Sequence, residues 1–375
     1  NEYVDQIENI ARERAKKLFG VPYANVQPYS GSPANFAVYV ALCEPGDTVM
    51  GLDLTNGGHL THGWKASATS MFFRSIQYHV KEDGYIDLEE VERLAAEHKP
   101  KLIWVGATAY AREFPFRKFS KIAEKVGAYL IADIAHVSGL VVAGVHESPV
   151  PYAHVVTTTT HKTLRGPRGG IVMVTEKGIK KDSELPMKID RAIFPRLQGG
   201  PHDHQTAAIA VALKEAETAK FRAYGKQVVR NAQALAAGLL SHGLELVSGG
   251  TDNHMVLLCC GPGRGIFLEK ALSEVGITVN KNTIPREPSS PFYPSGVRIG
   301  TPAVTTRGLR AVEMKRVAEW IARTMRAVDA YQLPEGKEVR VEYVRKFLKE
   351  IKSHRDIRAI RKEIHSMCRR FPLYR

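Results

Sequence analysis

The chain has 375 residues, with 53 Lys and Arg against 39 Asp and Glu, which gives a formal net charge of +14 at pH 7. This length exceeds one ordinary core and predicts two domains, and no run approaches the roughly 20 apolar residues that cross a membrane. The four cysteines show no metal-ligand spacing and two of them are adjacent, so we expect no metal site and a reducing compartment, the cytoplasm or an organelle matrix.

The first motif with chemical content is Ser30-Gly31-Ser32, followed by Pro33 and an apolar helical pattern through Val40. Proline near the first helical position and small polar residues before it are typical of a helix start. The free N–H groups and positive dipole end there favour an anion, and the expected ligand is a phosphate. A plain helix cap without a ligand is the alternative.

The first half of the chain alternates strand-like and helical stretches. This rhythm predicts an α/β fold with a mainly parallel sheet flanked by helices. We expect strands near 47–54, 71–78, 101–107, 128–133, 154–160 and 170–175, and helices at 86–98 and 115–126.

Asp133 ends one of these apolar strands, at the sheet edge where the ligands of open α/β sheets gather. Lys162 follows 29 residues later, where a β-branched strand leads into a glycine-rich turn that also holds Arg165 and Arg168. The pair suits a pyridine cofactor, because a carboxylate can keep the ring nitrogen protonated while an amine holds the aldehyde. A helix cap or metal ligand is the alternative for Asp133, and a surface lysine for Lys162.

The second half reads as a smaller α/β domain. A helix after Pro201, through 207–219, should lead into it, with strands at 244–248, 254–260 and 296–300 and a helix at 308–330. We therefore expect a large cofactor-binding domain over 1–212 and a small domain over 213–375.

Seven motifs, in this order, resemble serine hydroxymethyltransferase, a fold-type I pyridoxal-phosphate enzyme, and the resemblance runs along the whole chain. The motifs are Tyr23 to Ser32, Gly57 to Gly63 (GGHLTHG), Asp133 with Ala135-His136, Val155 to Lys162, Gln198 to Pro201, Gly249 to His254 and Thr278 to Asn282.

The resemblance implies a role for each matching residue of the cofactor site. Lys162 would form the internal aldimine, Asp133 would pair with the pyridine nitrogen, and His59 would stack on the ring, with a core histidine as the alternative. Thr159 and His161 would tune proton transfer around the lysine. The other cofactor-binding residues would be Ser30, Gly31, Ser32, Thr108, His136, Arg168, Gly199 and Gly200, the last from a neighbouring subunit.

The implied reaction converts serine and tetrahydrofolate reversibly into glycine and 5,10-methylenetetrahydrofolate, with aldol cleavage of 3-hydroxy amino acids as a side activity. Arg298 would bind the substrate carboxylate through its bidentate fork, a surface arginine being the alternative. The resemblance also implies a homodimer or a dimer of dimers with active sites at the subunit interface, and no membrane partner. Folate would contact Leu54, Gly58, His59, Leu60, Asn282, Ser290, Pro291 and Phe292.

The chain begins at a point well inside the family's sequence, so we expect the family's N-terminal arm to be absent. In the family this arm carries a serine for the substrate carboxylate and a tyrosine, a glutamate and a second tyrosine that reach the partner's site. A truncated form that binds the cofactor without turnover is therefore an alternative function.

The basic character is concentrated at the end of the chain. Residues 331–375 hold 13 Lys and Arg against 6 Asp and Glu, and 339–351 place apolar residues at helical spacing between basic ones. A docked amphipathic helix with a solvated face explains this pattern. The alternative is a nucleic-acid-binding surface on an enzyme scaffold.

Overall fold

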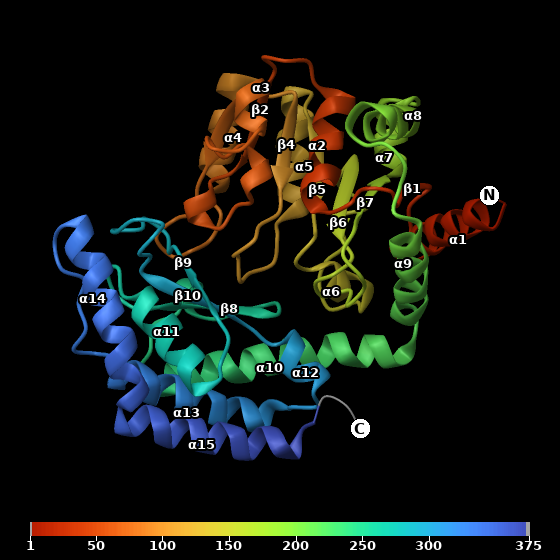
Figure 1. The fold of residues 1–375 in the computed structure, drawn as a ribbon. Coiled ribbons are helices and arrows are strands. Elements are labelled where there is room, and N and C mark those ends of the chain that lie inside the picture. The colour runs from red at the N-terminus through yellow and green to blue at the C-terminus, as the bar shows by residue number, and fades with distance from the viewer. Residues whose placement is uncertain (1, 373–375) are drawn as a thin grey trace. The chain divides into compact units, whose positions relative to one another are not determined.

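The computed structural model describes residues 2–372, which form two compact units (Figure 1). The first comprises Asn1–His79, Ile86–Thr108 and Glu113–Lys226, and the second Val80–Tyr85, Ala109–Arg112 and Gln227–Arg375. Along the sequence, the last boundary between the two units follows Lys226, inside helix α10 (Ala219–Ser241). The domain boundary expected at 212 stays a prediction.

A sheet of seven strands forms the centre of the first unit within the described residues, in the order β1-β7-β6-β5-β4-β2-β3. Strands β3, β2, β4, β5 and β6 are parallel, and β7 runs antiparallel to β6. Strand β1 pairs antiparallel with β7 and so runs in the direction of the five parallel strands. The predicted α/β class is therefore confirmed. The strands are β1 (Tyr23–Asn25), β2 (Thr48–Leu52), β3 (Arg74–Tyr78), β4 (Leu102–Val105), β5 (Tyr129–Asp133), β6 (Val155–Thr159) and β7 (Gly170–Val174).

Helices pack on this sheet, and strands β4, β6 and β7 are buried along their whole length. The side chain of Asp87 begins α4 by accepting the N–H of Glu90, and Gly127 ends α5 in the left-handed conformation that glycine adopts without strain. The helices are α1 (Glu2–Phe19), α2 (Gly31–Leu42), α3 (Thr69–Phe72), α4 (Leu88–His98), α5 (Phe116–Val126), α6 (Ser138–Val142), α7 (Glu176–Lys181), α8 (Leu185–Arg191) and α9 (Asp203–Ala216).

The second unit packs helices on a small antiparallel sheet ordered β8-β10-β9. Its core includes Phe267 of α11, Trp320 of α13 and Phe347 of α14, all at most 2% exposed. Within residues 2–372 no helix combines the length and apolar character needed to cross a bilayer. The elements are β8 (Met255–Cys259), β9 (Asn280–Asn282), β10 (Gly296–Gly300), α11 (Gly265–Val275), α12 (Pro302–Thr306), α13 (Ala311–Ala327), α14 (Lys337–Glu350) and α15 (Arg355–Arg370).

The strand expected at 244–248 is wrong. Leu246 makes one isolated bridge to Leu258, and the chain then turns through Val247–Gly249 with Ser248 at φ 58°. Gly249 and Gly250 also have positive φ, and the Arg112 side chain bonds to the Ser248 carbonyl. The turn ends the pairing before a strand can form. The three-residue strands β1 and β9 were not predicted, because they are too short to show a period.

Candidate functional site

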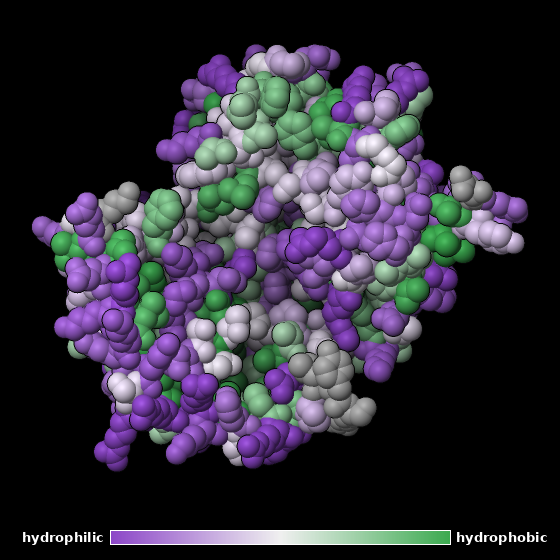
Figure 2. Space-filling model, in the orientation of Figure 1, coloured by the Kyte–Doolittle hydropathy of each residue, from purple (hydrophilic) through white to green (hydrophobic). Residues whose placement is uncertain are grey.

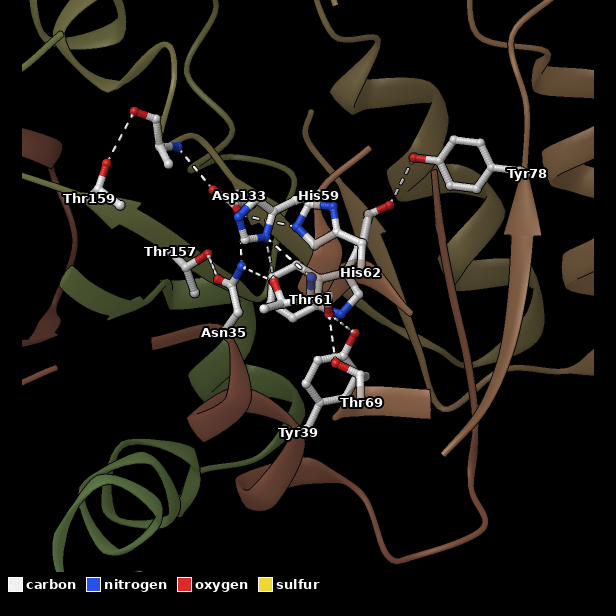
Figure 3. Close-up of polar contacts among 12 residues, drawn as sticks. Asn35, Tyr39, His59, Thr61, His62, Thr69, Tyr78, Asp133, Thr157 and Thr159 are labelled. Carbon is white, nitrogen blue, oxygen red and sulfur yellow. Dashed lines mark hydrogen bonds and ion pairs between the residues drawn. The ribbon is translucent and has the colours of Figure 1, made fainter. Parts of the chain in front are cut away.

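The candidate site lies at the carboxyl edge of the parallel strands in the first unit. Asp133 ends β5, and the loop after β2 supplies His59 and His62 (Figure 3). Lys162 follows β6. Gly106, directly after β4, has φ 149°, and a Cβ there would lie 2.2 Å from the Asp133 carbonyl oxygen. Glycine thus lets two strand ends approach closely at this edge.

Asp133 is 8% exposed and accepts three hydrogen bonds. Its Oδ2 accepts from His62 Nε2 at 3.0 Å and Asn35 Nδ2 at 2.8 Å, and its Oδ1 accepts from the N–H of Ala135 at 3.0 Å. Burial alone would raise the pKa of this carboxyl, but the hydrogen bond and charge of His62, assisted by His59 and Asn35, hold it well below its usual value. Asp133 is therefore a buried anion.

This anion fixes the hydrogen-bond directions around it. A carboxylate only accepts, so the amide NH₂ of Asn35 faces Asp133 and its Oδ1 accepts from the Thr157 hydroxyl at 2.7 Å. The same NH₂ donates to Thr61 Oγ1 at 2.8 Å, which leaves the Thr61 hydroxyl proton for His59 Nδ1 at 2.7 Å. His59 Nδ1 is then an acceptor, and a neutral His59 carries its proton on Nε2.

His59 is neutral at physiological pH. Burial, the charge of His62 and, more weakly, the charge of Lys162 lower its pKa to about 4, against the opposing effect of Asp133. Thr61 holds the ring by two contacts, from its hydroxyl and from its N–H at 3.3 Å. The ring is thus fixed in both orientation and tautomer.

Lys162 lies in the turn after β6, close enough for its charge to lower the pKa of both His59 and His161. Burial is the largest cause of the lowered pKa of His161, followed by Arg168. Arg168 Nη1 lies 3.3 Å from His161 Nε2, and because arginine only donates, that nitrogen accepts. Of the predicted residues, Lys162, His161, Arg168 and His59 are therefore gathered in one place.

The turn Ser30–Ser32 leads into α2, and its backbone is packed against the ends of β6 and β7. The N–H of Gly170 donates to the Pro28 carbonyl at 2.9 Å, and a Cβ on Gly31 would lie 2.8 Å from Thr159 Cγ2. Ser30 is the N-cap of α2 but makes no side-chain cap hydrogen bond. The N-terminal N–H groups of this 12-residue helix thus face the same edge as Lys162, which suits an anion.

The predicted loop residues Gly199 and Gly200 lie beside this turn within the same chain. Gln198 accepts the Tyr29 N–H at 3.1 Å, and the Tyr29 hydroxyl donates to the Gly200 carbonyl at 2.8 Å. A Cβ on either glycine would meet nothing within 4 Å. The contribution of Gly200 from a neighbouring subunit stays a prediction.

Thr108 and His136 are anchored by their backbones at this edge. The Thr108 N–H donates to the Gly57 carbonyl at 2.8 Å, and the Thr163 hydroxyl donates to the His136 carbonyl at 3.0 Å. Thr159 turns its own hydroxyl toward the Ala135 carbonyl, at 3.5 Å. The first contact joins the loop after β4 to the loop after β2, and the other two join the loop after β5 to β6 and the loop that follows it.

The predicted folate residues of the first unit lie in the loop after β2. Leu54 begins a 3₁₀ turn, Leu60 is 50% exposed, and Gly58 is buried so tightly that a Cβ would lie 1.9 Å from the Leu52 carbonyl oxygen. This crowding requires glycine at position 58 and fixes the path of the loop toward His59.

The predicted carboxylate ligand and the other folate residues belong to the second unit. Arg298 lies on β10, where burial lowers the pKa of its guanidinium, and its Nη2 donates to Asn280 Oδ1 at 3.2 Å. Asn282 lies on β9, and the segment Ser290-Pro291-Phe292 ends in an aromatic side chain that is 78% exposed. Their roles stay predictions.

Sequence reasoning missed three residues of the polar network, namely Asn35, Thr61 and His62. His62 follows His59 by three residues in the same glycine-bounded motif, and this spacing was a usable signal. His59, His62 and Asp133 also place one ligand-type atom each within 4.8 Å, as a metal site would. In the structure His62 and Asp133 use these atoms to bond each other.

Comparisons with known proteins agree on one family. The family model described as serine hydroxymethyltransferase matches residues 1–321. The chain is 55% identical over 330 residues to serine hydroxymethyltransferase of Acidothermus cellulolyticus, covering 87% of this chain and 76% of that protein. It is 47% identical over 375 residues to serine hydroxymethyltransferase 2 of Pseudomonas fluorescens, covering 100% of this chain and 83% of that protein.

Proposed function

Because the chain belongs to the serine hydroxymethyltransferase family, we propose that it transfers the hydroxymethyl group of serine reversibly to tetrahydrofolate, giving glycine and 5,10-methylenetetrahydrofolate. Enzymes of this family use pyridoxal 5′-phosphate, and tetrahydrofolate is the co-substrate. The observation that carries the proposal is the buried Asp133 anion at the end of β5, with Lys162 close enough for its charge to act on His59, which also acts on Asp133.

The residues of the first unit fit the cofactor. A pyridinium nitrogen needs a carboxylate that stays ionised away from water, and the three donors around Asp133 supply that condition. A phosphate fits the N-terminus of α2 at Gly31 and Ser32, where Gly31 leaves space beside Thr159 that a Cβ would fill. When bound, the cofactor supplies an electron sink for the charge released at the substrate α-carbon.

The protein's residues hold the cofactor and manage protons. Lys162 would hold the cofactor through Nζ, which must be a free amine to do so. His59 would present the face of a neutral ring, because its Nδ1 is occupied by Thr61 and its pKa is about 4. Because Arg168 donates to His161 Nε2, a neutral His161 carries its proton on Nδ1, and that buried nitrogen would act as a hydrogen-bond donor.

In the second unit Arg298 would bind the substrate carboxylate. Support comes from the burial that lowers the pKa of its guanidinium, since a buried cation gains strongly from a bound anion. In the same unit Asn282, on the neighbouring strand β9, and the 290–292 segment would contact folate. In the first unit the folate contacts would come from Leu54 and Leu60. The cofactor site and Arg298 would also allow aldol cleavage of 3-hydroxy amino acids in the absence of folate.

The decisive experiment is chemical mapping of the lysine. The chain is loaded with pyridoxal phosphate and reduced with borohydride, and the peptides are read by mass spectrometry. We expect a pyridoxyl group on Lys162 at one equivalent per chain, and none at that stoichiometry in Lys162→Ala. Lys121→Ala, which removes an exposed lysine of α5, is the matched control. Full labelling of another lysine in the Lys162→Ala protein would contradict the proposal.

We further propose a homodimer in the cytoplasm. Exposed apolar side chains on the first unit, including Met71 at 81% and Phe194 at 55%, support burial against a second copy. The four cysteines are free thiols, which supports a reducing compartment. Sedimentation of the loaded protein at two concentrations tests the dimer.

A further inference from the structure

The chain carries more than half of its charge excess outside the region that the family model matches. That match ends at residue 321, and residues 322–375 hold 15 Lys and Arg against 7 Asp and Glu, an excess of 8 out of +14. Figure 2 shows mostly hydrophilic residues over α14, at the left of the view, and over α15, along its lower edge. The proposed catalysis uses none of this surface.

Helix α15, within this segment, has one buried face and one charged face. Ile357, Ile360 and Ile364, at most 4% exposed, pack into the core of the second unit. The opposite face presents four exposed cations at helical spacing, Arg355, Arg358, Lys362 and Arg369, which we call the α15 stripe. At 1.5 Å per residue the stripe is about 21 Å long, with one cation every ~5–7 Å on average.

The α15 stripe is not neutralised by the protein's own carboxylates. Among residues 2–372 no ion pair involves its four side chains. Of the two acids on α15, Glu363 is bound by Arg316 and Arg323 of α13, and the charge of Asp356 acts on Arg323. A straight row of uncompensated cations raises the local concentration of a linear polyanion.

The other side chains on the charged face of α15 indicate which class of partner this face can bind. Between the cations lie Ala359, His365 and Ser366, so this face of α15 has no large apolar side chain that could enter a bilayer. The single imidazole of His365 is too small a platform to stack a row of unpaired bases. A rigid helix with a charged face fits the wide major groove and flanking phosphates of B-form DNA, whereas the deep, narrow groove of duplex RNA excludes it. We propose that the α15 stripe binds the phosphate backbone of double-stranded DNA without reading its sequence.

The test is binding of the cofactor-loaded full chain to a fluorescently labelled 24-base-pair DNA duplex, followed by anisotropy. Four phosphate contacts predict that affinity falls about 10²-fold between 50 and 200 mM salt. The variant with Arg355→Gln, Arg358→Gln, Lys362→Gln and Arg369→Gln should bind at least 10-fold more weakly at 50 mM salt, with a flatter salt dependence.

A matched variant removes the same charge from the first unit. It carries Arg74→Gln, Lys99→Gln, Lys118→Gln and Lys121→Gln, all at exposed positions, and should keep DNA affinity within about 3-fold of the unmodified chain. Both variants should keep serine cleavage, which shows that they fold. The proposal is overturned if both lose affinity equally, if neither does, or if no saturable binding occurs at 50 mM salt. Tighter binding to the same duplex in RNA, or to vesicles of anionic phospholipid, would also overturn it.

Discussion

His62 donates its Nε2–H to Oδ2 of Asp133 at 3.0 Å, and both side chains are almost completely buried. The His62 ring is also stacked on Trp104, with ring centroids 4.9 Å apart and planes 13° from parallel. The stack fixes the plane of the imidazole, and the hydrogen bond fixes the carboxylate. His62 is thus a positioning residue for the anion at the centre of the candidate site.

Replacing this donor should weaken cofactor binding. His62→Phe keeps a ring against Trp104 but removes the hydrogen bond, so the pKa of Asp133 rises and its anion is less stable. A hydrogen bond to a buried charge contributes about 1.5–3 kcal/mol, which corresponds to a 10- to 100-fold lower affinity for pyridoxal phosphate. Absorbance titration of the apoprotein measures this. Asp133→Asn should lose at least as much affinity, and unchanged binding by His62→Phe would refute the role of His62.

Because Gly31 lies close to Thr159, we expect one substitution at Gly31 to disturb the phosphate site and a second, at Thr159, to restore it. Gly31→Ala places a Cβ 2.8 Å from Thr159 Cγ2, and such overpacking costs about 1–3 kcal/mol. The turn should shift and phosphate affinity should fall by about 5- to 100-fold. Adding Thr159→Ser removes Cγ2, keeps the hydroxyl and should restore most of the loss. Thr159→Ser alone is the control, and failure of the double variant to recover would contradict a purely steric cause.

His154 should make the protein less stable in mild acid. It is 4% exposed, its Nδ1 accepts the Leu130 N–H at 2.8 Å, and burial, with Lys181 and Lys177, lowers its pKa to about 4. Between the unfolded pKa near 6.5 and pH 4 only the unfolded state binds the proton, so stability is complete above pH 6.5 and falls as pH decreases toward 4. The expected loss is about 2–3 kcal/mol.

His154→Asn is the matched variant, because its Oδ1 can replace Nδ1 as acceptor but does not titrate. Urea unfolding at pH 7.5, 6, 5 and 4 should show a shallower decline for the variant than for the unmodified chain. Parallel declines would show that His154 is not the titrating group.

Glu363 should stabilise the helices of the second unit, and this stabilisation should be lost at a lower pH than the one at which His154 acts. Its carboxylate binds Arg323 and Arg316 and accepts from Trp320 Nε1 at 2.8 Å, and these contacts, led by Arg323, lower its pKa to about 2. The stabilisation is complete above the unfolded pKa near 4.3 and is lost as pH falls toward 2. Because the side chain is 31% exposed, screening reduces its contribution to about 1–2 kcal/mol.

Glu363→Gln tests this contribution. The difference in the free energy of unfolding between the two proteins should be about 1–2 kcal/mol at pH 7 and should shrink below pH 4.5. Glu335→Gln, at an exposed position outside the helices, is the control and should change stability little. A difference that stays constant down to pH 3 would assign the effect to packing.

Strands and helices that follow a short repeating pattern of apolar residues could be predicted from the sequence alone. The short apolar run ending in Asp133 and the β-branched run at 154–160 predicted strands of a mainly parallel sheet, and β5 and β6 end at the same edge of it. The strand expected at 244–248 does not form, although the local residues are apolar. Arg112, 136 residues away from Ser248 in sequence, bonds to the Ser248 carbonyl, and the two glycines that follow have positive φ. A contact between residues so far apart in the sequence produces no periodic pattern from which it could be predicted.

The sequence by itself determined the family, the α/β class and the residue types of the site, because these depend on local motifs and on the alternation of strands and helices. Only the tertiary structure decided that Asp133 is held as an anion by His62 and Asn35, which lie 71 and 98 residues away along the chain. It also decided the tautomer of His59 and the uncompensated row of cations on α15. Ionisation states and hydrogen-bond directions depend on which groups meet in space after water is excluded, and chain order does not specify that.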